Sequence, residues 1–385
     1  MTMIRSKRAL ILSMGILAAG LAAWGIQTSS QAQERVVKIG YIGPLTGPNT
    51  SIGIGTRNSL ELAIRHANER KALPYKLELV SETDDSKPSV GVATVQKMCA
   101  DPSIVAVSAH WNSNVALATN SYFQECGLLN LIAGTGANKI TELGLSAIGR
   151  VATPFKAVLP FLADRTFKDL SLRRIAIVKS RDDYGKDVAT EFRQHYETLG
   201  GKIVIEEEYN IGERDFSSIL TKIRQVNPDA VFLAGLSTEA ALVVKQMRQL
   251  GMKQLYLGHP GWQSDAFVKA AGTEGEGAVV VTMPPFPEEL PGGPAFVSSY
   301  AKAGFKEPYD TFGVFGYVAG EVLVELIKRN GLDRKALIDG LRKITKDNPV
   351  KTILGSVYFD ADGELQPKTP GLAILKAGEW LRYQK

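Results

Sequence analysis

Strand-like and helix-like segments alternate along almost the whole chain, and this alternation constrains the fold more than any other feature. Short β-branched or aliphatic runs such as VVKIGYI (36–42), SIVAV (103–107) and DAVFLAG (229–235) predict strands. Between them, segments such as SLELAIRHANE (59–69) and STEAALVVKQMRQLG (237–251) carry apolar residues at helical spacing. Alternation of this kind predicts parallel sheets flanked by helices, so we expect an α/β fold with doubly wound sheets.

The composition of the chain changes twice, and both changes predict a crossing between two lobes. Pro154 and Pro160 interrupt the first run of elements, and five prolines with two glycines fall within 283–294. A mostly helical block (295–345) and two short strands follow, which indicates that the chain returns to the first lobe. We expect lobe 1 to comprise 33–153 and 284–365, and lobe 2 to comprise 154–283 and 366–385, with a cleft between them.

The first 32 residues have the organisation of a secretory signal peptide. A basic start (MTMIRSKR) precedes an apolar core of about 18 residues, and Ser30 and Ala32 are small residues suited to cleavage after Ala32. The mature chain would begin at Gln33 and be exported. The alternative is an uncleaved membrane anchor. No cysteine follows the apolar core, which argues against a lipid anchor, and we expect no later membrane span.

Charge and motif content argue against a nucleic-acid-binding protein and against an enzyme. The net charge of +5 falls to +2 when Arg5, Lys7 and Arg8 leave with the signal peptide, so no basic field for nucleic acid remains. The glycines of GYIGPLTG (40–47) do not fit the dinucleotide spacing. The chain also lacks G-x-S-x-G and H-E-x-x-H motifs and Cys/His pairs at metal spacing. We therefore expect no catalytic residues, no cofactor and no metal.

The two cysteines, Cys99 and Cys126, each lie near the end of a predicted helix, a few residues before a predicted strand. If those strands are neighbours in one parallel sheet, both thiols lie at the same edge of it. Export makes a disulfide feasible, and two free buried thiols are the alternative. Both remain open at this point, because only the geometry decides.

Polar and aromatic residues gather where predicted strands end and predicted helices begin. In HWNSN (110–114), Ser113 is placed to cap the following helix, and the next amides are free to receive an anion. Ligands of open parallel sheets bind beyond the carboxyl ends of the strands, so these exits predict one site in the cleft. A cap without any ligand role is the alternative interpretation of Ser113. The residues at the other exits are Gly134, Thr135, Gly136, Tyr184, Ser237, Thr238, His259, Pro260 and Trp262.

The order of several motifs resembles the leucine/isoleucine/valine-binding protein family, which are type I periplasmic solute-binding proteins of ATP-driven importers. The resemblance covers nearly the whole mature chain. It implies two α/β lobes with three crossings, closure around a small solute, and delivery of that solute to a membrane permease. We also expect a monomer. The motifs are KIGYIGPLTGPNTSIG (38–53), ETDDSKPSVGVATVQKM (82–98), AHWNSNVALA (109–118), IAIVKSRDDYGKDVATEF (175–192), NPDAVFLAG (227–235) and LGSVYFDADGEL (354–365).

The resemblance carries over well to the residues that hold a carboxylate. Family members that bind amino acids hold the carboxylate with a Ser, which Ser113 matches, and Trp111 and Asn112 lie beside it. The family also uses a Thr in the loop that resembles AGTGAN (133–138). Here Gly136 stands at that position, with Thr135 just before it.

The resemblance carries over poorly to the residues that hold the rest of an amino acid. The Tyr that lines the second lobe is matched by Tyr184, but a second lining Tyr is replaced by Leu236. The acidic residue that receives the ammonium group corresponds to Pro260 in GHPGW (258–262). Glu239 or Asp265 could substitute for it from a neighbouring position.

These departures decide which ligand we expect. A buried ammonium group without a partner costs several kcal/mol, so a carboxylate without an amino group is favoured over an amino acid. His110, Trp111, Tyr184 and Trp262 would provide flat apolar walls for an aromatic or otherwise apolar acid. An exported ligand-sensing receptor or a small-amide-binding protein is the alternative.

Overall fold

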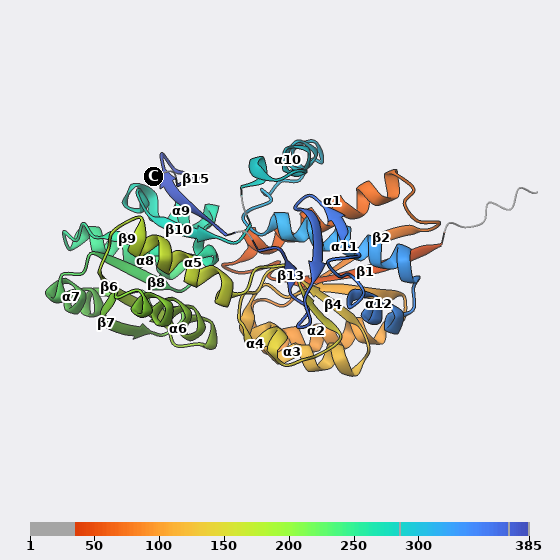
Figure 1. Ribbon diagram of the computed structural model, residues 1–385, viewed down its shortest axis with the longest axis horizontal. Helices are drawn as coiled ribbons and strands as arrows, with labels where there is room; N and C mark the ends of the chain where they lie inside the picture. The colour runs from red at the N-terminus through yellow and green to blue at the C-terminus, as the bar shows by residue number, and fades with distance from the viewer. Residues whose placement is uncertain (1–34, 285, 369, 384–385) are drawn as a thin grey trace, which may run out of the picture. The chain divides into compact units, whose positions relative to one another are not determined.

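The computed structural model describes residues 35–284, 286–368 and 370–383, and the predicted signal peptide (1–32) lies outside this range. Within the described residues the strands form two main sheets and one small sheet, flanked by helices. This arrangement confirms the α/β class. In Figure 1 the green middle of the chain gathers around one main sheet, and the red-to-yellow beginning surrounds the other.

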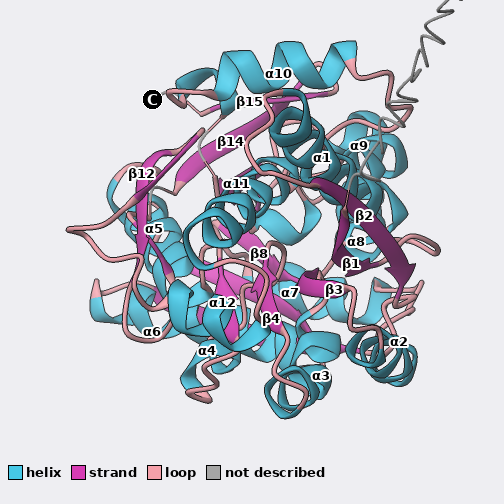
Figure 2. Cartoon of the chain, turned by 90° about the vertical axis from the view of Figure 1, so that its right-hand side faces the viewer, coloured by secondary structure: helices cyan, strands magenta, loops and turns pink. Residues whose placement is uncertain are grey.

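Lobe 1 is built on a parallel sheet with the described strand order β2-β1-β3-β4-β5. Its central strand β3 is buried along its whole length because helices cover both faces of the sheet. Helices α1 and α11, which are far apart in the sequence, pack against each other (Figure 2). The strands are β1 (Val36–Gly43), β2 (Lys76–Thr83), β3 (Ile104–Ala109), β4 (Leu129–Ile132) and β5 (Ile148–Arg150). The helices are α1 (Thr50–Glu69), α2 (Pro88–Ala100), α3 (Ser113–Glu125), α4 (Lys139–Glu142), α10 (Gly293–Lys302), α11 (Gly313–Asn330) and α12 (Arg334–Leu341).

Lobe 2 is built on a sheet with the described order β15-β14-β10-β9-β8-β6-β7. The pairs from β7 to β10 are parallel, but β14 and β15 join antiparallel, so this sheet is mixed at one edge. The strands are β6 (Arg174–Ser180), β7 (Lys202–Tyr209), β8 (Ala230–Ala234), β9 (Leu255–Gly258), β10 (Val279–Thr282), β14 (Gly371–Lys376) and β15 (Glu379–Arg382). The helices are α5 (Phe155–Lys168), α6 (Asp183–Thr198), α7 (Ser217–Val226), α8 (Ser237–Gln249) and α9 (Asp265–Ala271), with short 3₁₀ turns η1 (Pro260–Trp262) and η2 (Gly272–Gly275). A third turn, η3 (Pro287–Glu289), follows the crossing after β10 and packs on α10 of lobe 1.

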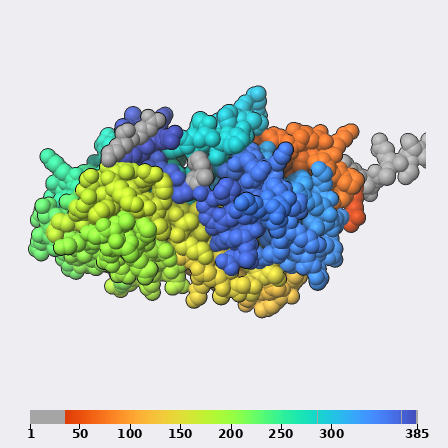
Figure 3. All heavy atoms as spheres, in the orientation of Figure 1, coloured from red at the N-terminus to blue at the C-terminus, as the bar shows by residue number. Residues whose placement is uncertain are grey.

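The chain passes between the lobes after β5, after β10 and after β13. The small antiparallel sheet comprises β11 (Val350–Thr352), β12 (Gly355–Phe359) and β13 (Leu365–Gln366), and β14 follows in the sheet of lobe 2. Blue, C-terminal atoms therefore lie beside both orange and green atoms in Figure 3. The boundaries 33–153 with 284–365 and 154–283 with 366–385 remain our proposal for the two lobes.

A buried ion pair connects two of these crossings. Arg150, the last residue of β5, pairs with Glu364, which directly precedes β13, and both side chains are almost fully buried. Arg150 also donates to the carbonyls of Ala137 (2.5 Å) and Thr135 (3.4 Å) in the loop after β4. Burial opposes ionisation of Glu364, but Arg150 and Lys368 outweigh it and hold the pKa of this carboxyl below its ordinary value.

A disulfide joins Cys99, near the end of α2, to Cys126, directly after α3. Their Cα atoms are 5.9 Å apart, a separation common among disulfides. The strands that follow them, β3 and β4, are neighbours in the parallel sheet, as the sequence argument requires. The structure therefore selects the disulfide over two free thiols.

None of the helices in the described part of the chain combines the length and the hydrophobicity needed to cross a bilayer.

We expect Glu364→Gln to lower the free energy of unfolding by about 3–5 kcal/mol, because it leaves Arg150 buried without its ionic partner. The control is Glu142→Gln, which removes the exposed partner of Lys156 and should cost no more than about 1 kcal/mol. Urea denaturation measures both. The pKa of Glu364 is lower in the folded protein than in the unfolded chain. Its contribution to the free energy of unfolding is therefore complete above the pKa of the unfolded chain, and it is lost as the pH falls through the pKa of the folded protein. On acidification, the free energies of unfolding of the wild-type protein and of Glu364→Gln should therefore converge. Equal losses of stability for Glu364→Gln and Glu142→Gln at neutral pH would contradict the role of the ion pair.

Reduction of the disulfide should lower the free energy of unfolding by about 2–4 kcal/mol, because the loop between the cysteines gains freedom in the unfolded chain. Denaturation with and without reductant measures this, and the Cys99→Ser/Cys126→Ser variant should not respond to reductant. Two reactive thiols in the denatured, unreduced protein would contradict the pairing.

Candidate functional site

Loops at the carboxyl ends of strands from both lobes line one cavity. Lobe 1 contributes the loops after β3 and β4, and lobe 2 contributes those after β6, β8 and β9. The space among these residues is about 380 Å³ when the part open to solvent is included, and about 20 Å³ of it can hold the centre of a water-sized molecule. Parallel α/β sheets bind their ligands at this edge. The lining residues are Trp111, Asn112, Ser113, Asn114, Gly134, Gly136, Phe155, Asp182, Tyr184, Leu236, Gly261, Met283 and Phe312.

The predicted site residues lie together at this cavity. Thr135 lies behind Ser113, with their hydroxyl oxygens 2.6 Å apart, and His259 lies behind Tyr184, with Nδ1 3.0 Å from the phenol oxygen. Pro260 is buried beside His259 in η1 and does not line the cavity. The predicted residues that line it directly are Trp111, Asn112, Ser113, Gly134, Gly136, Tyr184 and Leu236. Their role in ligand binding remains a proposal.

The start of α3 provides hydrogen-bond donors at the lobe 1 end of the cavity. The N-cap is Asn112, in an extended conformation, and Ser113 is already helical, so the predicted capping role of Ser113 is wrong. The Ser113 hydroxyl contacts Thr135 instead. The Val115 amide donates to the Asn114 side chain (2.9 Å), which leaves the amides of Ser113 and Asn114, at the open start of the helix, for a ligand.

An anion at this end would be held without a basic side chain. Among the described residues that line the cavity there is no Lys or Arg. The positive end of the α3 dipole and the free amides favour negative charge at this point. When Thr135 donates to Ser113, the Ser113 hydroxyl adds one further donor. The lobe 1 end is therefore suited to a carboxylate.

Gly134 allows the loop after β4 to approach the loop after β3. A Cβ atom at Gly134 would lie 2.7 Å from Trp111 Cδ1 and 2.8 Å from Trp111 Cα, closer than real contacts allow. This close approach brings the Thr135 hydroxyl to Ser113 and accounts for glycine in this loop.

Tyr184 forms the lobe 2 end of the cavity. It lies in the first turn of α6, whose N-cap Asp182 accepts from the Gly185 amide at 3.0 Å. The ring packs edge-on against Phe155, with the centroids 5.4 Å apart. Burial, with a smaller contribution from Asp182, raises the pKa of Tyr184 well above its ordinary value. The side chain is therefore a neutral phenol.

The apolar walls differ from those that the sequence predicts. Trp111 lines the cavity and packs edge-on against Phe312, which the sequence argument missed because Phe312 follows no strand. Trp262 is fully buried in the core of lobe 2, where it packs on Tyr256, so its predicted place in the wall is wrong. The same correction applies to His110, which is buried in a contact with Asp84 (2.7 Å between Nδ1 and Oδ2).

Of the described residues that line the cavity, one is acidic, and it is not one that we predicted. Glu239 accepts from the Gly212 amide (3.0 Å) and does not line the cavity, and Asp265 lines a different cavity. Asp182 lines it instead. The signal in the sequence was the first Asp of SRDDYG (180–185), at a strand exit, which is also what an ordinary N-cap looks like.

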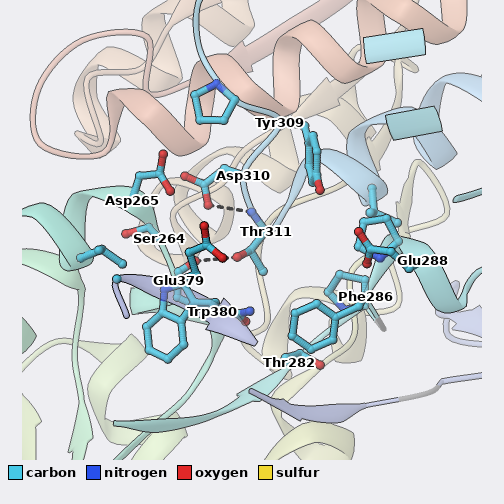
Figure 4. Close-up of a pocket in the computed structure, with 17 residues that line it drawn as sticks. Ser264, Asp265, Thr282, Phe286, Glu288, Tyr309, Asp310, Thr311, Glu379 and Trp380 are labelled. Carbon is cyan, nitrogen blue, oxygen red and sulfur yellow. Dashed lines mark hydrogen bonds between the residues drawn. The ribbon is translucent and has the colours of Figure 1, made fainter. Parts of the chain in front are cut away.

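A larger cavity lies at the crossing that follows β10 (Figure 4). Its walls carry Asp265, Glu288, Asp310 and Glu379, with Asp265, Asp310 and Glu379 pointing toward one another. Burial and the nearby Asp265 raise the pKa of Asp310 to about 6. This concentration of carboxylates repels an anion, so the cavity beside Ser113 is the better site for a carboxylate.

The described residues contain no cluster of three or more His, Cys, Asp and Glu side chains that is arranged to hold a metal ion.

Comparisons with known proteins agree with this architecture. A sequence model of the family described as "periplasmic binding protein" matches residues 36–371. The Leu/Ile/Val-binding protein homolog 1 of Brucella melitensis is 29% identical over 367 residues, which cover 94% of each chain.

Solved structures share the fold at low sequence identity. The branched-chain amino acid transporter substrate-binding protein of Streptococcus pneumoniae, in complex with isoleucine, has a TM-score of 0.83 at 20% identity and covers 90% of this chain and 98% of its own. A solute-binding protein from R. palustris, in complex with benzoate, has a TM-score of 0.80 at 21% identity and covers 90% of this chain and 95% of its own. Likeness at this level of identity shows the fold.

The Ser113 and Thr135 hydroxyls should be energetically coupled, because each is the hydrogen-bond partner of the other. We expect Ser113→Ala and Thr135→Val each to lower the free energy of unfolding by about 1 kcal/mol, and the double variant to lose little more than one of them. Urea denaturation measures the cycle. The control combines Ser113→Ala with Thr166→Val, in α5 of lobe 2, and the losses of stability from these two substitutions should add. Additive losses for Ser113→Ala and Thr135→Val would contradict the contact.

Proposed function

The chain belongs to the periplasmic binding protein family, and from this premise we propose that it captures a small carboxylate-bearing solute between its two lobes for an ATP-driven importer. The resemblance to leucine/isoleucine/valine-binding proteins is confirmed by the family match and the named relatives. Members of this family bind solutes in the periplasm and are not enzymes. The partners of the chain would be the solute and a membrane permease, and we propose that it acts as a monomer.

The observation that carries the proposal is the position of Ser113. Its hydroxyl is not used to cap α3, and it lies beside two helix amides at a cavity without basic side chains. A charge-assisted hydrogen bond to a carboxylate is about twice as strong as a neutral one, so this group of donors selects a carboxylate. The remaining walls, from Trp111, Phe155 and Phe312, suit an apolar or aromatic body.

The favoured solute is an apolar or aromatic acid without an amino group. Pro260 stands where the resemblance places the acidic partner of an ammonium group, and neither Glu239 nor Asp265 lines the cavity. The structural neighbour from R. palustris is in complex with benzoate, an aromatic acid without an amino group, and this supports the preference. An amino acid is the second candidate because Asp182 does line the cavity, and because the Brucella relative is named as a Leu/Ile/Val-binding protein homolog.

Closure of the lobes provides the mechanism. A solute at the start of α3 contacts Tyr184 and Leu236 of lobe 2 only when the lobes are together. The solute therefore binds the closed form more tightly than the open form and shifts the population toward it. The permease would recognise this closed form.

Calorimetry with matched acids and amides tests the proposal. We expect 3-phenylpropanoate to bind at least about tenfold more tightly than 3-phenylpropanamide, which has the same body without the charge. Ser113→Ala should weaken the binding of the acid by about 1–2 kcal/mol. The control is Ser217→Ala, at the exposed first residue of α7, which should leave the affinity unchanged. Equal binding of acid and amide, or no binding of any carboxylate in a panel that includes leucine, would overturn the proposal.

A further inference from the structure

The larger cavity beside Asp310 gathers negative charge that the surrounding protein does not balance. Asp265, Glu288, Asp310 and Glu379 belong to its walls, and the described residues that line it include no Lys, Arg or His. In the described part of the chain, none of these four carboxylates takes part in an ion pair. Carboxylates that converge without a cation repel one another, so a positively charged ligand would stabilise this region.

Three of these carboxylates meet at one point. Asp265 at the start of α9, Asp310 in the loop before α11 and Glu379 at the start of β15 point toward one another (Figure 4). Asp310 accepts from the Ser51 hydroxyl (3.2 Å), yet burial and, to a smaller extent, Asp265 raise its pKa to about 6. A pKa raised in this way indicates that no positive neighbour compensates for the burial of the carboxylate.

A buried side chain in the same wall lacks a hydrogen-bond partner. Gln263 lines the cavity and is 6% exposed. Its side-chain oxygen is buried and has no hydrogen-bond partner among the described residues. The backbone carbonyl of Gln263 accepts from the Thr311 hydroxyl (2.5 Å), which holds this residue next to Asp310. A buried acceptor without a partner is unfavourable, so this oxygen is a further group that an N–H donor in the cavity would satisfy.

Aromatic rings complete the walls. Phe286, Tyr309 and Trp380 line the cavity together with the carboxylates. Trp380 packs against Phe267 (5.7 Å between ring centroids) and edge-on against Trp262 (6.1 Å), so its ring is held in place. Aromatic faces attract ammonium groups and offer contact area to the alkyl part of an organic cation. Metal ions such as Mg²⁺ and Ca²⁺ would gain little from such walls, because they prefer oxygen ligands.

The size of the cavity also fits an organic ion. About 370 Å³ of it can hold the centre of a water-sized molecule, compared with about 20 Å³ beside Ser113. Small-molecule sites commonly measure about 300–1,000 Å³. In the described part of the chain, no three His, Cys, Asp or Glu side chains are arranged to hold one metal ion. The four carboxylates therefore surround a space for a molecule of several atoms.

We propose that this cavity is a second binding site, which takes a protonated alkylamine. The ammonium group would lie among Asp265, Asp310 and Glu379 with its alkyl chain against Trp380, and a diamine would place its second charge toward Glu288. The cavity shares no lining residue with the one proposed for the carboxylate, so this inference goes beyond the proposed function and does not depend on it. Because α9 and β15 belong to lobe 2 and the loop before α11 to lobe 1, the amine would contact both lobes.

A charged ligand and its neutral counterpart test the proposal. Calorimetry on the full mature chain would compare 1,4-diaminobutane, 1,4-butanediol and Mg²⁺ at neutral pH. We expect the diamine to bind at least about tenfold more tightly than the diol, because only the diamine is charged, and its affinity should fall as salt is added. Equal affinities of diamine and diol, or tighter binding of Mg²⁺ than of the diamine, would overturn the inference. If the diamine does not bind, the inference is wrong, whereas the proposed function is tested by carboxylates alone.

Asp265→Asn tests the charge at the start of α9. Asn preserves the size of the side chain, and the N-cap Ser264 keeps its contact with the Phe267 amide. We expect this variant to bind the diamine about tenfold more weakly. The matched control is Asp183→Asn, because Asp183 is likewise the first residue of a helix, α6, and does not line the cavity. Unchanged affinity in Asp265→Asn, or an equal loss in Asp183→Asn, would overturn the proposal.

Trp380 tests the aromatic wall through two substitutions. Trp380→Leu removes the ring, whereas Trp380→Phe keeps an aromatic face toward the cavity. We expect Trp380→Leu to bind the diamine about fivefold more weakly and Trp380→Phe to lose less than about twofold, because the face of a ring attracts the cation. Equal losses in the two variants, or no loss in Trp380→Leu, would overturn the role of the ring and with it the choice of an organic cation.

Discussion

The buried ion pair between Arg150 and Glu364 determines how the parts of this molecule are held together. The two residues are 214 positions apart. Arg150 lies at the first crossing, after β5, and Glu364 lies just before β13, after which the chain crosses for the last time. The guanidinium group also binds the carbonyls of Thr135 and Ala137, so the loop after β4, whose Thr135 hydroxyl contacts Ser113, is fixed to the same point. A charge buried in this way needs its partner, so the pair constrains these two crossings as well as the stability of the protein.

With that loop fixed, the start of α3 presents hydrogen-bond donors to the cavity, and Tyr184 and Leu236 of lobe 2 line the cavity from the other side. In our proposal, a solute whose carboxylate lies at the start of α3 contacts both lobes and so joins them. The energetic reason for closure is then the same as the reason for specificity: the donors at the start of α3 lose water on closure and must find partners in the ligand.

The sequence predicted the strands well and the directions of side chains poorly. Runs such as VVKIGYI (36–42) are short and rich in β-branched residues, which favours a strand over a helix, and β1 confirms this. The disulfide followed once β3 and β4 were neighbours. The prediction for Trp262 was wrong because a side chain in a loop after a strand can point either into the core or into the cleft. The hydrophobic pattern of the sequence does not distinguish these two directions. We predicted Ser113 as the N-cap of α3, whereas the N-cap is Asn112. Asn and Ser are both common N-caps, so the sequence does not show at which of these two neighbouring residues the helix begins. The partner of Arg150 is distant in the sequence, and no local pattern indicates it.

The most direct measurement of the central claim is the crystal structure of the mature chain with 3-phenylpropanoate. We expect closed lobes around the cavity, with the ligand carboxylate about 2.7–3.2 Å from Ser113 Oγ and from the free amides of α3. A ligand bound in the opposite orientation, or in the larger cavity beside Asp310, would contradict the account.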